Sequence, residues 1–248
     1  MQVLIGDILG ESTTHYPGIA ASVIFMGKCN FKCRFCYDFN FIDPMLCKKM
    51  DTQDVFNKVM EGRQLISGVV FDGGEPTVQA EAFAELCHLF KNEGLKVKVN
   101  TNGSNPGIIA ELAARNLIDY VCVDVKAPLE LADEYKRLVD VPLGNILHDV
   151  HETMKLKGAF KFILECRTTI VPGFNDHGHF IEMIAKEVRP YADLYVLQQF
   201  RPEKGTMDPE LQNVAAPSRK QLLEFARRVK RIARDVRIRT LEMGEEKI

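Results

Sequence analysis

The sequence lacks the features that mark several large classes of protein. It has only 17 glycines and 11 prolines in 248 residues, too few for a collagen-like or low-complexity chain. Lysine and arginine (32) nearly balance aspartate and glutamate (34), so no overall field attracts nucleic acid or an anionic membrane. The longest apolar stretch, residues 19–26, is broken by Ser22 and is too short to cross a bilayer. The N-terminus has no basic segment followed by a long apolar run, so we expect no signal peptide and a cytoplasmic protein.

What is present is typical of a globular chain. Hydrophobic residues make up 46% and charged residues 27%. A chain of this size buries about three quarters of the surface that its unfolded form exposes, so the core needs no disulfides. No linker separates two domains. We therefore expect a single domain over residues 1–248, with its core from about residue 18 to residue 200.

Short β-branched runs alternate with amphipathic segments along the chain. The expected strands are residues 22–26, 69–71, 97–100, 120–123, 160–171 and 194–198. The expected helices are residues 51–62, 80–93, 108–115 and 129–156, a helix after Asp176, and a basic amphipathic helix over about 217–239 with a capping box at Ser218 and Gln221. Such alternation predicts a parallel sheet with right-handed crossovers. Six units in this length predict an α/β fold, an open and partial (β/α)6 barrel of the TIM type.

Candidate chemistry falls where these strands end. Three cysteines follow the first strand, residues 73–76 follow the second, residues 101–103 the third, and residues 124–126 the fourth. The carboxyl ends of parallel strands share one rim, where such folds build their sites. We therefore expect these residues to meet.

Three of the seven cysteines, Cys29, Cys33 and Cys36, lie within eight residues. In a reducing compartment this crowding indicates metal or redox chemistry rather than disulfides. Three thiolates can hold a cubane iron–sulfur cluster and leave its fourth iron open, which is typical of a catalytic site. The alternative is a zinc site or an electron-transfer cluster closed by Cys47. We interpret the remaining cysteines as small buried hydrophobes: Cys87, Cys122 and Cys166.

The CxxxCxxC spacing after the first strand resembles the signature of the radical S-adenosylmethionine (SAM) superfamily. Three further stretches resemble the activating enzymes of glycyl radical enzymes: GGEPTVQ at 73–79, TNGSNP at 101–106 and DYVCVDVKAP at 119–128. The similarity is closest to the activators of anaerobic ribonucleoside-triphosphate reductase and pyruvate formate-lyase. Residues 12–18 and 197–202 match the same group, so the resemblance covers about residues 10–202.

This resemblance implies the cofactors, the reaction and the partners. Cys29, Cys33 and Cys36 would hold a 4Fe–4S cluster whose open iron chelates SAM. Reductive cleavage of SAM would give methionine and a 5′-deoxyadenosyl radical, which takes hydrogen from a glycine of a partner glycyl radical enzyme. The electron would come from a donor of the flavodoxin or ferredoxin type. A monovalent cation beside SAM is known in some relatives.

The resemblance also implies which residues contact SAM. Glu75 would accept a hydrogen bond from its ammonium group, and Gly73 and Gly74 would let the backbone approach it closely, unless they form only a turn. Asn102, Lys126 and Arg167 would contact its carboxylate or ribose. The full set of expected cofactor-binding residues is Tyr37, Gly73, Gly74, Glu75, Pro76, Thr101, Asn102, Gly103, Asp124, Lys126, Arg167, Val171 and Gln198.

Two positions depart from the activating enzymes. The last cysteine is followed by Tyr37 and Asp38 where those enzymes have His-Asn, and Tyr37 either covers the cluster or the adenine or packs within the loop. Asn100 stands where relatives with the cation have aspartate. The chain has no further cysteine cluster, which excludes an auxiliary ferredoxin-like domain.

Other interpretations stay open at this point. One is a radical SAM enzyme that acts on a small molecule or nucleoside, such as a deazaguanine-forming synthase. Another is a non-catalytic iron–sulfur or zinc protein. The basic segment at 217–239 is either a solvated helix face or a docking surface for an acidic partner or RNA.

Overall fold

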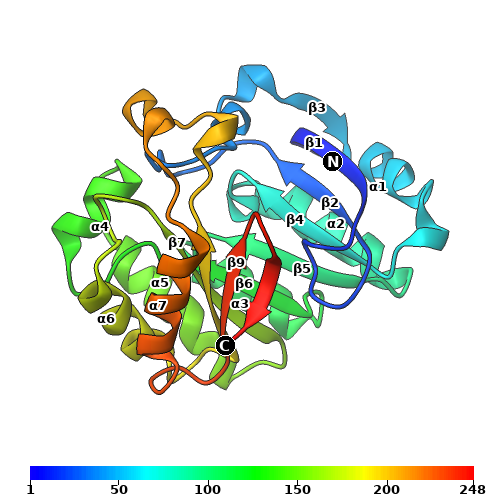
Figure 1. Cartoon of the computed structure of the whole chain (residues 1–248). Helices are drawn as coiled ribbons and strands as arrows, with labels where there is room; N and C mark the ends of the chain where they lie inside the picture. The colour runs from blue at the N-terminus through cyan, green and yellow to red at the C-terminus, as the bar shows by residue number, and fades with distance from the viewer.

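A computed structural model of the chain describes residues 1–203 and 205–248 in full (Figure 1). The strands are β1 (Gln2–Ser12), β2 (Ala21–Met26), β3 (Lys48–Asp51), β4 (Gly68–Gly73), β5 (Lys96–Thr101), β6 (Tyr120–Asp124), β7 (Ile163–Ile170), β8 (Leu194–Gln199), β9 (Val236–Thr240) and β10 (Gly244–Lys247). The α-helices are α1 (Thr52–Met60), α2 (Ala80–Asn92), α3 (Pro106–Ala114), α4 (Ala132–Val139), α5 (Ile146–Lys155), α6 (Gly178–Val188) and α7 (Arg219–Val229).

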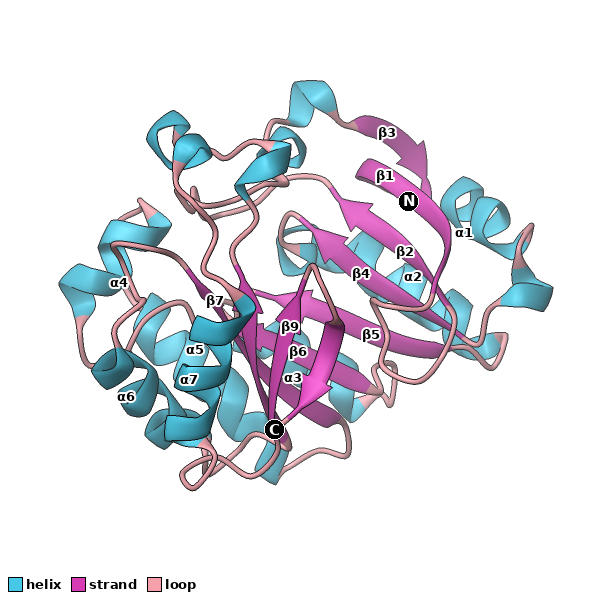
Figure 2. Ribbon diagram, viewed as in Figure 1, coloured by secondary structure: helices cyan, strands magenta, loops and turns pink.

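The strands form one curved sheet in the order β10-β9-β8-β7-β6-β5-β4-β2-β1-β3. Neighbours from β2 to β9 pair in parallel, and the strands at both ends pair antiparallel. The order does not return to its start, so the sheet stays open. Figure 2 shows the helices on the outside of this curved sheet. The expectation of an open, mostly parallel α/β fold is thus confirmed, with all six predicted strands present as β2 and β4 to β8.

The main core lies between the sheet and its helices. On α2, Phe83, Leu86 and Phe90 are fully buried, as their helical spacing predicts. Phe71 of β4 meets the Phe83 ring edge-on at a centroid distance of 4.9 Å. The capping box of α7 is present as predicted, because the Ser218 side chain accepts from the Gln221 backbone while the Gln221 side chain reaches back. Among the described residues, no helix is long and apolar enough to span a bilayer.

The structure corrects the prediction of a basic helix over 217–239. Helix α7 ends at Val229, and residues 236–240 form strand β9, which extends the parallel sheet beside β8. In β9, Val236, Ile238 and Thr240 are buried and alternate with Arg237 and Arg239, which is the period of a strand. The sequence predicts a helix here because apolar residues spaced three or four apart precede this segment and continue the helical pattern into it.

The prediction differs from the structure in one further helix and in three strands. The helical material expected over 129–156 is two helices, since Asp140 ends α4 in the left-handed conformation (φ 49°) and α5 begins only at Ile146. Strands β1, β3 and β10 were not predicted. They form the antiparallel ends of the sheet, where β1 pairs with β2 and β3 at one end and β10 pairs with β9 at the other.

Candidate functional site

The three clustered cysteines lie on the loop that follows β2. Backbone hydrogen bonds hold this loop against the end of α4, from the Lys32 amide to the Val139 carbonyl and from the Arg34 amide to the Leu138 carbonyl, both at 3.0 Å. The Arg34 guanidinium also forms an ion pair with Asp208. The loop is therefore a fixed part of the rim, supported from two sides.

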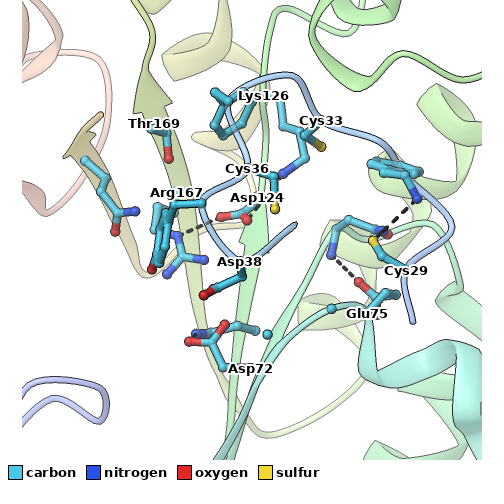
Figure 3. A pocket seen from close by; sticks show the side chains of 18 of the residues that line it. Cys29, Cys33, Cys36, Asp38, Asp72, Glu75, Asp124, Lys126, Arg167 and Thr169 are labelled. Atoms are coloured by element: carbon cyan, nitrogen blue, oxygen red, sulfur yellow. Dashed lines mark hydrogen bonds and ion pairs between the residues drawn. The ribbon is translucent and has the colours of Figure 1, made fainter. Parts of the chain in front are cut away.

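All three thiols face the same cavity, which lies at the carboxyl ends of the parallel strands (Figure 3). Among the described residues, no three Cys, His, Asp or Glu side chains converge as tightly as one metal ion would require. Three thiols around one cavity could hold a cluster in which each cysteine binds a different iron. Burial raises the pKa of Cys29 to about 12, so cluster binding must displace its proton.

Cys47 lies apart from the other three. It does not line the cavity, and its thiol donates to the carbonyls of Phe41 and Asp43, each at 3.4 Å. The protein thus offers the cluster three thiols at this cavity. This arrangement supports the open-site interpretation over a site closed by Cys47.

The cavity encloses ≈ 120 Å³, and most of the residues expected to bind SAM line it. We name it the site cavity. Ten of the thirteen expected residues are in its lining: Tyr37, Gly73, Gly74, Glu75, Thr101, Asn102, Asp124, Lys126, Arg167 and Gln198. The other three are not: Pro76 starts a buried 3-10 turn after Glu75, Gly103 packs under Val123, and the Val171 amide donates to Asn175.

Glu75 is 1% exposed and is held by four hydrogen bonds. The backbone and hydroxyl of Thr77 and the hydroxyl of Thr101 donate to Oε1, at 3.1, 2.6 and 2.8 Å. The Asn102 amide donates to Oε2 at 2.6 Å. Burial raises the pKa of this carboxyl above its usual range despite these donors. Glu75 therefore ties the loops after β4 and β5 together, and Oε2, with a single donor, retains capacity for one more.

The two glycines before Glu75 are required by the fold itself. Gly73 has a φ of +88°, which side chains rarely adopt. A Cβ on Gly74 would overlap the carbonyl oxygen of Lys28 at the start of the cysteine loop. The Gly74 amide donates to the Met26 carbonyl, and the Glu75 amide to Lys28, both at 2.8 Å. The close approach that we expected toward a ligand is thus, at Gly74, an approach to the cysteine loop.

Asp124 lies between two buried cations. Arg167 Nε donates to its Oδ1 at 2.6 Å, and Lys126 Nζ lies 3.4 Å from its Oδ2 (Figure 3). Although burial raises the pKa of Asp124, attraction to Arg167 and Lys126 holds it at about 2. The Lys126 ammonium also lies 5.5 Å from the centre of the Phe35 ring on the cysteine loop. The side chains of Asp124, Arg167 and Lys126 together carry one net positive charge, which suits a ligand carboxylate.

Asn102 supports the cysteine loop. Its side-chain amide donates to Asn30 Oδ1 at 2.8 Å and approaches the Cys29 sulfur at 3.9 Å, and its oxygen accepts from the Ser104 amide. Its polar atoms are therefore already partnered within the chain. The loop after β5 thus positions the thiols as well as lining the cavity.

Several lining residues were not predicted as ligand contacts, among them Asp72, Asn100, Thr169 and Arg201. Asn100 Nδ2 donates to Asp72 Oδ2 at 2.8 Å, while Asn100 Oδ1 has no partner among the described residues. The Nε of Arg201 is likewise buried and unpaired there. Asp72, Thr169 and Arg201 lie near the carboxyl ends of β4, β7 and β8, so the strand-end rule could have found them.

A second cavity of ≈ 550 Å³, which we name the side chamber, borders the first. The two share six lining residues: Tyr37, Asp72, Asn100, Arg167, Gln198 and Arg201. The side chamber is further lined by residues 13–15, 17 and 18 of the β1–β2 loop and by residues 240, 241, 244 and 245 of the β9–β10 hairpin. The two ends of the open sheet therefore face each other across it.

Comparison with known proteins gives consistent results. The sequence model of the radical SAM superfamily matches residues 23–185. A Methanocaldococcus jannaschii protein with the provisional name glycyl-radical enzyme activating enzyme is 36% identical, over 97% of this chain and 98% of its own. The pyruvate formate-lyase 1-activating enzyme of Escherichia coli is 28% identical over 66% of each chain. A radical SAM methyltransferase from Sphaerobacter thermophilus has a similar fold (TM-score 0.68, 20% identity, 92% of this chain and 69% of that one).

Proposed function

Since this chain belongs to the radical SAM superfamily, we propose that it is an activating enzyme that generates a glycyl radical in a partner protein. When bound, the cluster and SAM supply a 5′-deoxyadenosyl radical, which takes one hydrogen atom from the glycine Cα and leaves the unpaired electron there. The observation that carries the proposal is the arrangement of the three thiols and the polar rim beside an open side chamber. The Methanocaldococcus jannaschii relative, which matches this chain over nearly its whole length, supports the proposal through its name.

We propose that the chain's own residues bind and orient these groups. Cys29, Cys33 and Cys36 hold the cluster. Glu75 Oε2 accepts from the ammonium group of SAM, and Lys126 with Arg167 binds its carboxylate or ribose hydroxyls. Tyr37 lines both cavities, where it separates the cofactor from the substrate and limits access of water.

By resemblance to the activating enzymes, we further propose an electron donor of the flavodoxin or ferredoxin type. A reducing, cytoplasmic location is also proposed, because all seven cysteines are free thiols. A monovalent cation beside Asp124 stays a prediction. Such an ion would meet Arg167 and Lys126, which already contact this carboxylate.

The test is an anaerobic incubation of the reconstituted enzyme with dithionite, SAM and candidate glycyl radical enzymes. We expect release of 5′-deoxyadenosine and a carbon-centred EPR doublet in one partner. The doublet must change its splitting when the partner carries Cα-deuterated glycine. If SAM is cleaved and no candidate partner yields a radical, the assignment to glycyl radical activation is wrong.

A second function is favoured by the polarity of the side chamber. Its lining includes His15, Lys98, Arg237 and Arg239, groups that could bind a small polar substrate. A radical SAM enzyme that modifies a small molecule or nucleoside would use this cavity as its substrate pocket. To test this alternative, the enzyme would be incubated with SAM and a deuterium-labelled metabolite extract that contains no other protein. Transfer of deuterium to 5′-deoxyadenosine would support it.

A further inference from the structure

The side chamber is open to solvent along one side. Its floor is buried, with Lys98 1% and Asn100 5% exposed, while its rim residues Thr13, Thr14 and Gly244 are exposed. Figure 1 shows the β1–β2 loop in blue and the β9–β10 hairpin in red on this open side of the sheet. At ≈ 550 Å³ the chamber is within the usual range of ligand pockets. A chain segment can therefore enter it between the loop and the hairpin.

Three cations of the chamber, Lys98, Arg237 and Arg239, already have carboxylate partners. Lys98 Nζ lies 3.5 Å from Glu165 and donates to the His15 carbonyl at 2.9 Å. Arg239 contacts Glu165 at 3.2 Å and Glu245 at 2.6 Å, and Arg237 contacts Glu245 at 2.7 Å. Burial lowers the pKa of His15, which favours the neutral imidazole. Apart from Arg201, these cations therefore leave little uncompensated charge with which to bind a phosphorylated small molecule.

The unpaired atoms of the chamber are one acceptor and one donor. Asn100 Oδ1 and Arg201 Nε are both buried without a partner among the described residues, and both residues lie on the wall that the chamber shares with the site cavity. Buried polar atoms are rarely left unpaired, so each is expected to bind something that enters. One acceptor and one donor are what the N–H and C=O groups of a polypeptide backbone require.

The hairpin at the rim has two features of a peptide-binding surface. Leu241 is 51% exposed and lines the chamber, and Met243, two residues on in the same turn, is 62% exposed. Strand β10 ends the sheet, and within the described residues it pairs only with β9. An exposed strand edge can receive an extended chain through its backbone, and neighbouring apolar side chains add specificity.

We propose that the glycine-bearing segment of the protein substrate binds in extended form along β10, packs on Leu241 and Met243, and passes into the side chamber. There its backbone meets Asn100 Oδ1 and Arg201 Nε. This inference rests on the proposed function and names the docking element for its substrate. The β9–β10 hairpin is thus the part of the chain that selects the partner.

The test compares Met243→Glu and Leu241→Glu with Leu65→Glu, whose parent residue is 64% exposed on a different surface turn. For each variant we would measure 5′-deoxyadenosine release without a partner, and then the KM for the partner that gives the EPR doublet. Both hairpin variants should cleave SAM at the parental rate. They should raise the KM for the partner about tenfold or more, because a charge would replace an apolar contact that becomes buried when the partner binds. Leu65→Glu should leave both values within about twofold.

A second measurement tests the strand pairing itself. Synthetic peptides that span the partner's glycine would be N-methylated at one backbone position at a time. Pairing along β10 predicts a period of two, in which methylation weakens binding at alternate positions only. A parental doublet with unchanged KM in both hairpin variants, or methylation effects without this period, would overturn the docking while leaving the proposed function intact. No doublet with any partner would remove both.

Discussion

The site cavity and the side chamber share a wall but are built in opposite ways. In the site cavity, Glu75 holds four donors and Asp124 holds two cations, and a third residue, Asn102, is bonded to the cysteine loop. On the wall that the two cavities share, two buried polar atoms lack partners among the described residues, and apolar side chains are exposed at the rim of the side chamber. The rest of the site cavity is fixed before any ligand binds, whereas the shared wall and the rim of the side chamber make contacts that only a ligand can complete.

This difference matches two tasks. A cluster and SAM are constant ligands, so a rigid network can position them in advance without loss of function. The protein substrate that we propose would arrive as a large and separate body, so its site needs an accessible edge and contacts that form on binding. The following predictions test whether rigidity is confined to the first cavity.

The largest effect is expected from removing a cluster ligand. Cys36→Ala should abolish SAM cleavage, because the variant keeps only two of the three thiols that we propose as cluster ligands. The matched variant Cys47→Ala removes a thiol of the same kind outside the cavity and should keep full cleavage. Iron content and 5′-deoxyadenosine release measure both. Loss of the cluster in Cys47→Ala would mean that this thiol is a ligand after all.

Breaking the ion pair under the side chamber should lower stability. Lys98→Met leaves the buried Glu165 with Arg239 and the Tyr120 hydroxyl as partners, and should cost about 3 kcal/mol in the free energy of unfolding. Adding Glu165→Gln should recover part of this loss, since the uncompensated charge is then removed. Urea unfolding of the metal-free protein measures both variants. If the double variant instead lost the sum of the unfolding free energies lost by the two single variants, the two side chains would act independently.

Filling the space at Gly74 should disturb the cysteine loop. In Gly74→Ala the new methyl group overlaps the Lys28 carbonyl, so the loop must shift, at a cost of about 2 to 3 kcal/mol and with weaker cluster retention. Gly107→Ala is the matched control, because its Cβ would meet nothing within 4 Å. Thermal unfolding and iron content report the two effects. A stable Gly74→Ala protein with a normal cluster would show that the loop is not rigid.

The smallest effect expected is in the pH dependence of stability. The pKa of Asp124 is about 2 in the folded chain, below its ordinary value of 3.8, so its ion pairs stabilise the fold above pH 3.8 and this is lost as the pH falls toward 2. The loss is about 2 kcal/mol. Asp124→Asn should flatten this part of the curve relative to the parent, and an unchanged slope in this variant would contradict the prediction. Urea midpoints between pH 5 and pH 2 measure the slope.

Prediction from the sequence was accurate for the part of the molecule in which the local pattern and burial agree. Strands β2 and β4 to β8 are buried runs bounded by turns, and their polar ends meet as parallel topology requires. It failed at the ends of the sheet. In β9 the basic residues at 237 and 239 alternate with buried ones, but they follow a helix whose apolar spacing conceals the change of period.

The sequence by itself determined the chemistry, because three closely spaced thiols and polar residues at successive strand ends can be read without coordinates. Only the tertiary structure decided what each of these residues contacts. Asn102 bonds the cysteine loop, Gly74 makes room for Lys28, and the two ends of the sheet enclose a second cavity. Such contacts join residues that are tens of positions apart, and the pairing depends on strand register and loop packing, which no local pattern encodes.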